Sequence, residues 1–94
     1  MSHSRPADVA LPLATSFMHF ERVDPTRNIR RGYTLVCQGS LFHEAVLVRT
    51  WGRIGSTRPQ SRQLPCTSWD EARQAMTKLA RRRLRRGYRL VRWE

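Results

Sequence analysis

The residues of this chain best suited to chemistry are arginines, and the chemistry they suit is phosphate binding. The 94 residues carry 18 Lys and Arg against 7 Asp and Glu, a formal net charge of +11. Every basic residue is arginine except Lys78. A guanidinium grips phosphate through a planar fork of donors and stacks on bases, whereas an ammonium is a hydrated point charge. The charge therefore predicts a polyanionic partner. Nucleic acid is the first candidate and an anionic membrane the second. A GC-rich genome, which favours arginine codons, explains the choice of arginine over lysine equally well. It does not explain the excess of positive over negative charge.

One predicted strand places an aromatic ring between two arginines. The run from Ala45 to Ile54 follows the two-residue strand period, so that Arg49, Trp51 and Arg53 share one face. If that face is exposed, the ring can stack on a sugar or base while the guanidiniums hold phosphates. The alternative is that Trp51 packs on a helix and the arginines only bury their stems.

A second basic cluster fills the C-terminal part, where no acid occurs between Glu71 and Glu94. On a helix, one face opposite the apolar stripe would carry Lys78, Arg81, Arg82 and Arg85. Uncompensated like charge on one face lowers stability, so this face predicts contact with nucleic acid. An anionic membrane, an acidic protein or a plainly solvated face are the alternatives. The membrane is disfavoured because the apolar stripe is needed for the core.

The elements that must position these residues can be placed along the chain. Residues 1–16 are small, polar and aperiodic, and predict a flexible leader before a single domain over residues 17–94. Pro65 indicates that the fourth strand ends at a sheet edge or outside the ladder. The expected strands cover residues 17–23, 32–39, 45–54 and 60–66, with turns over 24–28 and 55–59.

The helix has the clearest local signals. Ser68 and Glu71 form a capping box at its start, and Gly87 supplies a left-handed residue just past its end. The run from Tyr88 to Trp93 is either a short final strand or an ordered tail. The core stripe consists of Ala72, Met76, Leu79, Ala80 and Leu84. Strands followed by one helix predict an α+β fold, a small antiparallel sheet packed against one helix in the C-terminal half.

Other chemistry finds little support. His3, His19 and His43 have no metal-ligand spacing with one another or with the cysteines. Cys37 and Cys66 are expected to be buried reduced thiols, although a cross-strand disulfide stays open. No nucleophile-base set, paired carboxylates or phosphate-binding glycine loop occurs, so neither catalysis nor a cofactor is expected. No apolar run is long enough to span a membrane and no secretory signal is present, which predicts a cytoplasmic protein.

Several motifs in a fixed succession identify a family. Trp51-Gly52-Arg53 ends a β-run and is followed by a glycine-containing turn and the pair Gln60-Ser61. A capped helix and the ending Arg86-Gly87-Tyr88 come next, and the strand with Tyr33-Thr34-Leu35 comes before. This succession resembles the WGR domain family over roughly residues 17–89.

The resemblance implies roles for the motif residues. The family occurs in poly(ADP-ribose) polymerases, where it helps dock onto DNA breaks, and in short stand-alone bacterial proteins, which this chain resembles more. In the polymerases the motif Trp packs against the nucleic-acid backbone near a strand end. The motif Arg takes part in DNA or inter-domain contacts. The resemblance places these roles on Trp51 and Arg53.

Two positions depart from the family pattern. Pro59 stands where glycine usually precedes the Gln-Ser pair, so the hairpin is expected to close differently. In some members an Asn just before the Tyr of the second strand contributes phosphate contacts. Here Asn28 lies five residues before Tyr33, and Arg30 and Arg31 occupy the nearer positions. This arrangement favours arginine in place of the Asn contact.

The leading hypothesis is a non-catalytic, sequence-tolerant DNA-binding module, with the preference for strand ends or breaks implied by the resemblance. One alternative is a protein-interaction module that docks on a partner enzyme, and another is an RNA-binding accessory protein. Whether Tyr88 and Trp93 belong to the core or the binding face stays open. The expected nucleic-acid contacts are Trp51, Gly52, Arg53, Arg49, Arg30, Arg31, Gln60, Lys78, Arg81, Arg82 and Arg85.

Overall fold

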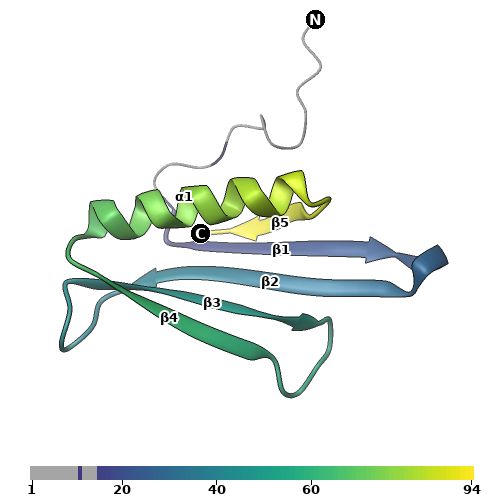
Figure 1. Cartoon of the computed structure of the whole chain (residues 1–94), viewed down its shortest axis with the longest axis horizontal. Coiled ribbons are helices and arrows are strands. Elements are labelled where there is room, and N and C mark those ends of the chain that lie inside the picture. Colours follow the sequence, from purple (N-terminus) through teal and green to yellow (C-terminus); the bar gives the residue numbers. More distant parts are fainter. Residues whose placement is uncertain (1–10, 12–14) are drawn as a thin grey trace, which may run out of the picture.

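A five-stranded antiparallel sheet forms the frame of the molecule, in the order β4-β3-β2-β1-β5 (Figure 1). The computed structural model describes Leu11 and residues 15–94, so most of the predicted leader lies outside the described residues. The elements are β1 (Phe17–Asp24), the 3-10 turn η2 (Pro25–Arg27), β2 (Ile29–Gln38), β3 (Ala45–Arg53), β4 (Gln60–Cys66), α1 (Trp69–Arg85) and β5 (Arg89–Trp93). The α+β prediction is confirmed, and β4 is an edge strand as Pro65 indicated.

Helix α1 starts and ends as its sequence predicts. The backbone amide of Glu71 donates to Ser68 Oγ at 3.0 Å, and the Glu71 carboxylate accepts from the Thr67 hydroxyl and backbone amide. At the other end Gly87 has φ +87°, the amide of Gly87 donates to the Leu84 carbonyl, and that of Tyr88 donates to the Arg83 carbonyl. These bonds satisfy the last helical carbonyls and turn the chain back into β5.

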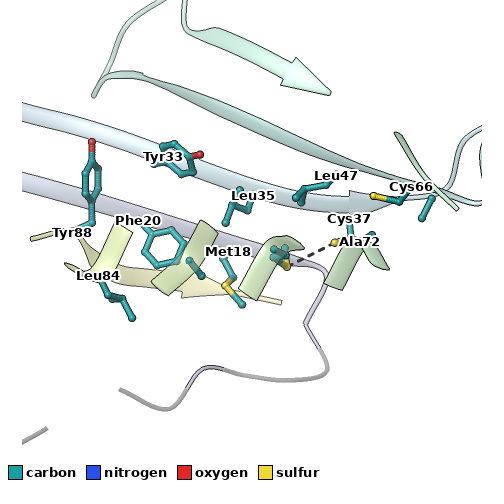
Figure 2. Packing of buried hydrophobic residues seen from close by; sticks show 13 residues of the cluster. Met18, Phe20, Tyr33, Leu35, Cys37, Leu47, Cys66, Ala72, Leu84 and Tyr88 are labelled. Atoms are coloured by element: carbon teal, nitrogen blue, oxygen red, sulfur yellow. Dashed lines mark hydrogen bonds between the residues drawn. The ribbon is translucent and has the colours of Figure 1, made fainter. Parts of the chain in front are cut away.

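One face of the sheet packs under α1 and makes the core. Alternate side chains of β1, β2 and β3 point to that face, and the buried helix residues are Ala72, Met76, Ala80 and Leu84. Leu79 is only partly buried, at the side of the stripe. Figure 2 shows the core running from Tyr88 and Leu84 at one end to Cys66 and Ala72 at the other. The predicted stripe is therefore confirmed, and Tyr33, Leu35 and Cys37 of β2 face it from the sheet.

Strand β5 settles the alternative left open for the C-terminal run. It pairs with β1, and its end is tied to residues that come before β1. The amide of Ser16 donates to the Glu94 carbonyl at 2.8 Å, and the Thr15 hydroxyl donates to the same carbonyl. Tyr88 is buried in the core, whereas Trp93 is half exposed.

Both cysteines are free and buried, as predicted. Cys37 Sγ lies 3.8 Å from Met76 Sδ, and Cys66 Sγ donates to the Leu64 carbonyl at 3.4 Å. Burial raises the pKa of the Cys37 thiol, and burial does the same for the pKa of the Cys66 thiol. Both groups therefore act as neutral core side chains, because reactivity requires the thiolate.

Candidate nucleic-acid interface

An open groove of about 460 Å³ lies where the core face of the sheet extends beyond the C-terminal end of α1. We call it the arginine groove. Five of its lining residues are arginines, three are aromatic and none is a carboxylate. It is lined by Arg27, Asn28, Ile29, Arg30, Arg31, Gly32, Tyr33, Trp51, Gly52, Arg53, Arg83 and Tyr88.

The pairing of β2 with β3 brings the lining residues together. Tyr33 lies opposite Trp51 and Arg31 lies opposite Arg53, so each pair shares one face of the sheet. The antiparallel register therefore brings together residues that are about 20 positions apart along the chain. Arg53 is exposed, and so are Arg30 and Arg31.

The ring of Trp51 lies between the ring of Tyr33 and the guanidinium of Arg49. Its ring stacks on Tyr33 with centroids 6.3 Å apart and an interplanar angle of 25°. Arg49 Cζ lies 5.3 Å from the ring centroid. Trp51 is partly buried against the core, on the same sheet face as α1. The predicted shared face of Arg49, Trp51 and Arg53 is confirmed, but Trp51 and Arg53 line the arginine groove whereas Arg49 lines a separate hollow beside α1.

Arg53 is held in position by the turn before β2. Asn28 adopts the left-handed conformation, with φ +54°, and closes η2 through a hydrogen bond from its amide to the Pro25 carbonyl. Arg53 Nη1 donates to the Asn28 carbonyl at 3.2 Å, and Nη2 donates to Asn28 Oδ1 at 3.1 Å. Asn28 therefore fixes the motif arginine and faces the groove, despite its distance from Tyr33 along the chain.

The floor of the groove contains a guanidinium held by two tyrosines. Arg83 Cζ lies 4.6 Å from the Tyr33 ring centroid and 5.3 Å from that of Tyr88. The two rings meet edge to face, with centroids 6.3 Å apart. The Tyr33 hydroxyl and Arg83 Nε are buried, and neither has a hydrogen-bond partner among the described residues. Buried polar atoms without partners cost free energy.

Carboxylates compensate little of the charge in the groove. Within residues 15–94 of the structure, Arg27 forms an ion pair with Asp24 at 3.7 Å, and His19 Nε2 lies 3.1 Å from Glu21 Oε2. Of the five groove arginines, Arg27 is thus the one that has a carboxylate partner in the described chain. The remaining four create a positive field without neutralisation, which attracts and holds anions.

The predicted contact residues divide between separate surfaces. The arginine groove contains Trp51, Gly52, Arg53, Arg30 and Arg31. Gln60 pairs with Trp51 across the β3–β4 ladder and does not line the groove. The outer face of α1 carries the exposed Lys78, Arg81, Arg82 and Arg85, and a shallow hollow there is lined by Lys78, Arg81 and Arg85 among others. Arg49, Lys78 and Arg82 also line a hollow between β4 and α1.

Seven of the groove residues were not among the predicted contacts: Arg27, Asn28, Ile29, Gly32, Tyr33, Arg83 and Tyr88. Arg83 comes four residues after Leu79 and three after Ala80 of the core stripe, and this helical spacing is a signal that its side chain leaves the helix close to the core. Tyr33 and Tyr88 meet only because β5 returns alongside β1, a tertiary contact that local pattern does not reveal. The shared groove could therefore not be assembled from spacing alone.

Two other kinds of site are absent from the described part of the chain. No group of three or more His, Cys, Asp or Glu residues there is placed to hold a metal ion. Helix α1 is neither long nor apolar enough to cross a bilayer, and no described helix is.

Comparisons with known proteins identify the family of the chain. Residues 16–92 match the family described as the WGR domain. Over 72 residues the chain is 36% identical to an uncharacterised protein, y4dW, of Sinorhizobium fredii (strain NBRC 101917 / NGR234). The aligned region covers 77% of this chain and 35% of that relative, so the chain spans about a third of the relative's length. No solved structure matches the chain.

Proposed function

The chain belongs to the WGR domain family, and from that premise we propose that it is a non-catalytic module that binds DNA through the arginine groove, largely without regard to sequence. WGR domains are not catalytic, and in poly(ADP-ribose) polymerases they serve as nucleic-acid-binding modules. The observation that carries the proposal is the groove itself. It combines uncompensated arginines, an accessible tryptophan and two buried polar atoms without partners among the described residues.

Phosphate is the ligand that this set of donors fits. Arg30, Arg31 and Arg53 are exposed at the mouth of the groove, and Arg83 lies on its floor. A phosphate oxygen that enters the groove would accept from the mouth arginines and satisfy Arg83 Nε or the Tyr33 hydroxyl. Charge-assisted bonds of this kind are about twice as strong as neutral ones. Contacts to phosphate carry no sequence information, which is why the proposed binding tolerates any sequence.

The position of Trp51 supports a preference for strand ends. Its ring lies inside the groove, between Arg49 and Tyr33, and part of it stays exposed. A ring in this position reaches the face of a sugar or base more easily where base stacking ends than inside a continuous duplex. We therefore extend the proposal to open ends and breaks.

The test is fluorescence anisotropy across a salt series with two DNA duplexes of equal length. One duplex has open 5′-phosphorylated ends, and in the other both ends are closed by hairpins. We expect tighter binding to open ends and a steep loss of affinity with salt. Equal, salt-sensitive binding to both duplexes would indicate a general nucleic-acid clamp. Absence of binding to either at moderate salt would contradict the proposal.

A matched variant links the result to the groove. Arg30→Gln/Arg31→Gln/Arg53→Gln removes three positive charges from the groove mouth and leaves the outer face of α1 intact. The proposal requires this variant to lose affinity and the preference for open ends together. An RNA duplex of the same sequence, added as competitor, separates DNA from RNA as the preferred ligand.

A further inference from the structure

A second groove, of about 420 Å³, lies between the edge strand β4 and helix α1. We call it the β4–α1 groove. Its apolar lining comes from Leu47 and Leu64 of the sheet and from Ala75 and Leu79 of the helix. Leu64 is 49% exposed, and Leu79 is only partly buried. An apolar surface of this kind, bounded by charged residues, is a common feature of protein-binding sites.

The border of the β4–α1 groove is positively charged. Two cations come from the strands, Arg49 and Arg62, and two from the helix, Lys78 and Arg82. No carboxylate lines the groove, and none of these four residues forms an ion pair among the described residues. The complementary occupant is therefore acidic as well as apolar.

Strand β4 also offers its backbone. It is the last strand of the sheet on this side and pairs with β3 alone. For residues 60–65, the described chain has no backbone-to-backbone hydrogen bond apart from those of the β3 ladder. An uncovered edge is a template for another strand, and Pro65 blocks it only near its C-terminal end.

We propose that the β4–α1 groove binds an extended acidic peptide segment of a partner protein, which adds to β4 as a sixth strand. Side chains of an added strand alternate, so every second one would point toward α1 and pack on Leu64 and Leu79. The acidic residues of the segment would lie against Arg62, Lys78 and Arg82. This surface goes beyond the proposed DNA binding in the arginine groove and does not depend on it, because no residue lines both grooves.

The lining favours a peptide over nucleic acid. It contains no aromatic ring for base stacking, in contrast to the three in the arginine groove. Aliphatic side chains beside a free strand edge match peptide recognition by strand addition, in which main-chain hydrogen bonds give affinity and pockets give specificity.

The test begins with selection from a phage-displayed library of random dodecapeptides on the immobilised full chain. We expect the enriched peptides to alternate apolar and acidic residues. A fluorescent copy of the most enriched peptide is then titrated with the native chain and with two variants. Leu64→Glu should weaken binding by about tenfold or more, because it removes apolar contact and repels the acidic peptide.

Val91→Glu is the matched control for charge and exposure. Val91 is also 49% exposed and lies on β5, the opposite edge strand. The same acidic substitution there should leave peptide affinity within about twofold, since distant sites act independently. Equal losses in both variants would show general attraction to a basic protein, and would overturn the proposal. So would the absence of enriched peptides.

Strand addition and nucleic-acid competition are tested with the same peptide. Two versions are N-methylated on alternate amides, in the two possible phases. One phase should abolish binding and the other retain it, since only alternate amides of an added strand face β4. Equal binding of both versions would rule out strand addition. Leu64→Glu should bind open duplex as the native chain does, and a loss of duplex binding in this variant would assign the groove to nucleic acid instead.

Discussion

The guanidinium of Arg53 is bound by Asn28 through two hydrogen bonds, to the backbone carbonyl at 3.2 Å and to Oδ1 at 3.1 Å. The two residues are 25 positions apart in the chain. They meet for two reasons. Arg31 of β2 lies opposite Arg53 in the ladder, and Asn28 adopts the left-handed conformation just before β2 begins. The turn therefore fixes the direction of the motif arginine before any ligand arrives, which lowers the entropy lost on binding.

This relationship predicts separate effects of two substitutions at Asn28. Asn28→Gly keeps the left-handed turn and removes the Oδ1 acceptor, so we expect a loss in DNA affinity of about threefold with little change in stability. Asn28→Ala should in addition destabilise the fold by about 1 kcal/mol, because Ala lacks the short polar side chain that lets Asn adopt positive φ. Anisotropy and urea unfolding measure the two effects. An unchanged DNA affinity in Asn28→Gly would show that binding does not require the hydrogen bond from Arg53 to Asn28 Oδ1.

Removal of the Tyr33 hydroxyl should have opposite effects on stability and affinity. In the free chain this buried hydroxyl has no partner among the described residues, so Tyr33→Phe should stabilise the fold by about 1 kcal/mol. The unfolding temperature would then rise by about 4–8 °C for a domain of this size. If the hydroxyl donates to phosphate, DNA affinity should fall. Tyr88→Phe is the control, expected to leave stability unchanged, and a joint rise of stability and affinity in Tyr33→Phe would contradict the proposed contact.

The exposed face of α1 should contribute to the salt dependence of DNA binding but not to end preference. In Arg81→Gln/Arg82→Gln/Arg85→Gln the slope of log affinity against log salt should become shallower by about 0.9 for each phosphate that the variant no longer neutralises. The preference for open over closed duplex should stay as in the native chain, because the arginine groove is intact. The groove-mouth triple variant (Arg30→Gln/Arg31→Gln/Arg53→Gln) removes the same charge, and it should show both a shallower salt slope and a loss of the preference for open duplex. An unchanged slope in the helix variant would assign phosphate binding to the sheet alone.

Local signals in the sequence were sufficient for most of the fold. The Ser68-Glu71 pair and Gly87 define the ends of α1, since capping depends on residues within one turn of the helix. The alternation around Trp51 correctly assigned Arg49 and Arg53 to its face. The start of β2 was predicted three residues late, at Gly32 rather than Ile29, because the charged pair Arg30-Arg31 weakens the strand pattern there.

The candidate site was less predictable, because it depends on contacts between distant segments. Distance along the chain argued against a role for Asn28, but the η2 turn folds it back to Arg53. Arg83 belongs to the predicted basic run, and its helical position places it beside the core, but its contact with Tyr33 and Tyr88 depends on how the strands pack around the end of α1. Helical spacing predicts which side of α1 a residue is on, but not which strand lies beside it.

Stability should decline below about pH 5, and part of the decline should come from Glu71. The Thr67 hydroxyl, followed by the Thr67 amide, lowers the pKa of the Glu71 carboxyl through hydrogen bonds to the charged form. Because the folded pKa lies below the unfolded one, this contribution is present above the unfolded pKa and is lost as pH falls through the folded pKa. Urea unfolding of Thr67→Val between about pH 7 and pH 3 should show lower stability at neutral pH and a smaller loss on acidification. A pH profile parallel to that of the native chain would exclude this role for Thr67.

Substitution of Trp51 should weaken end recognition more than overall DNA affinity. The ring occupies the groove between Arg49 and Tyr33, whereas the positive charge that attracts the duplex comes from the arginines of the groove and of α1. In Trp51→Ala we expect binding to open 5′-phosphorylated duplex to fall by about tenfold, in line with about 1–3 kcal/mol for a stacked base. Binding to hairpin-closed duplex should fall much less. Trp93→Ala serves as control, because this half-exposed tryptophan on β5 does not line the groove. Equal losses on open and closed duplex in Trp51→Ala would mean that Trp51 supports the fold of the groove rather than contacting a strand end, and a thermal unfolding curve of the variant would then show the matching loss of stability.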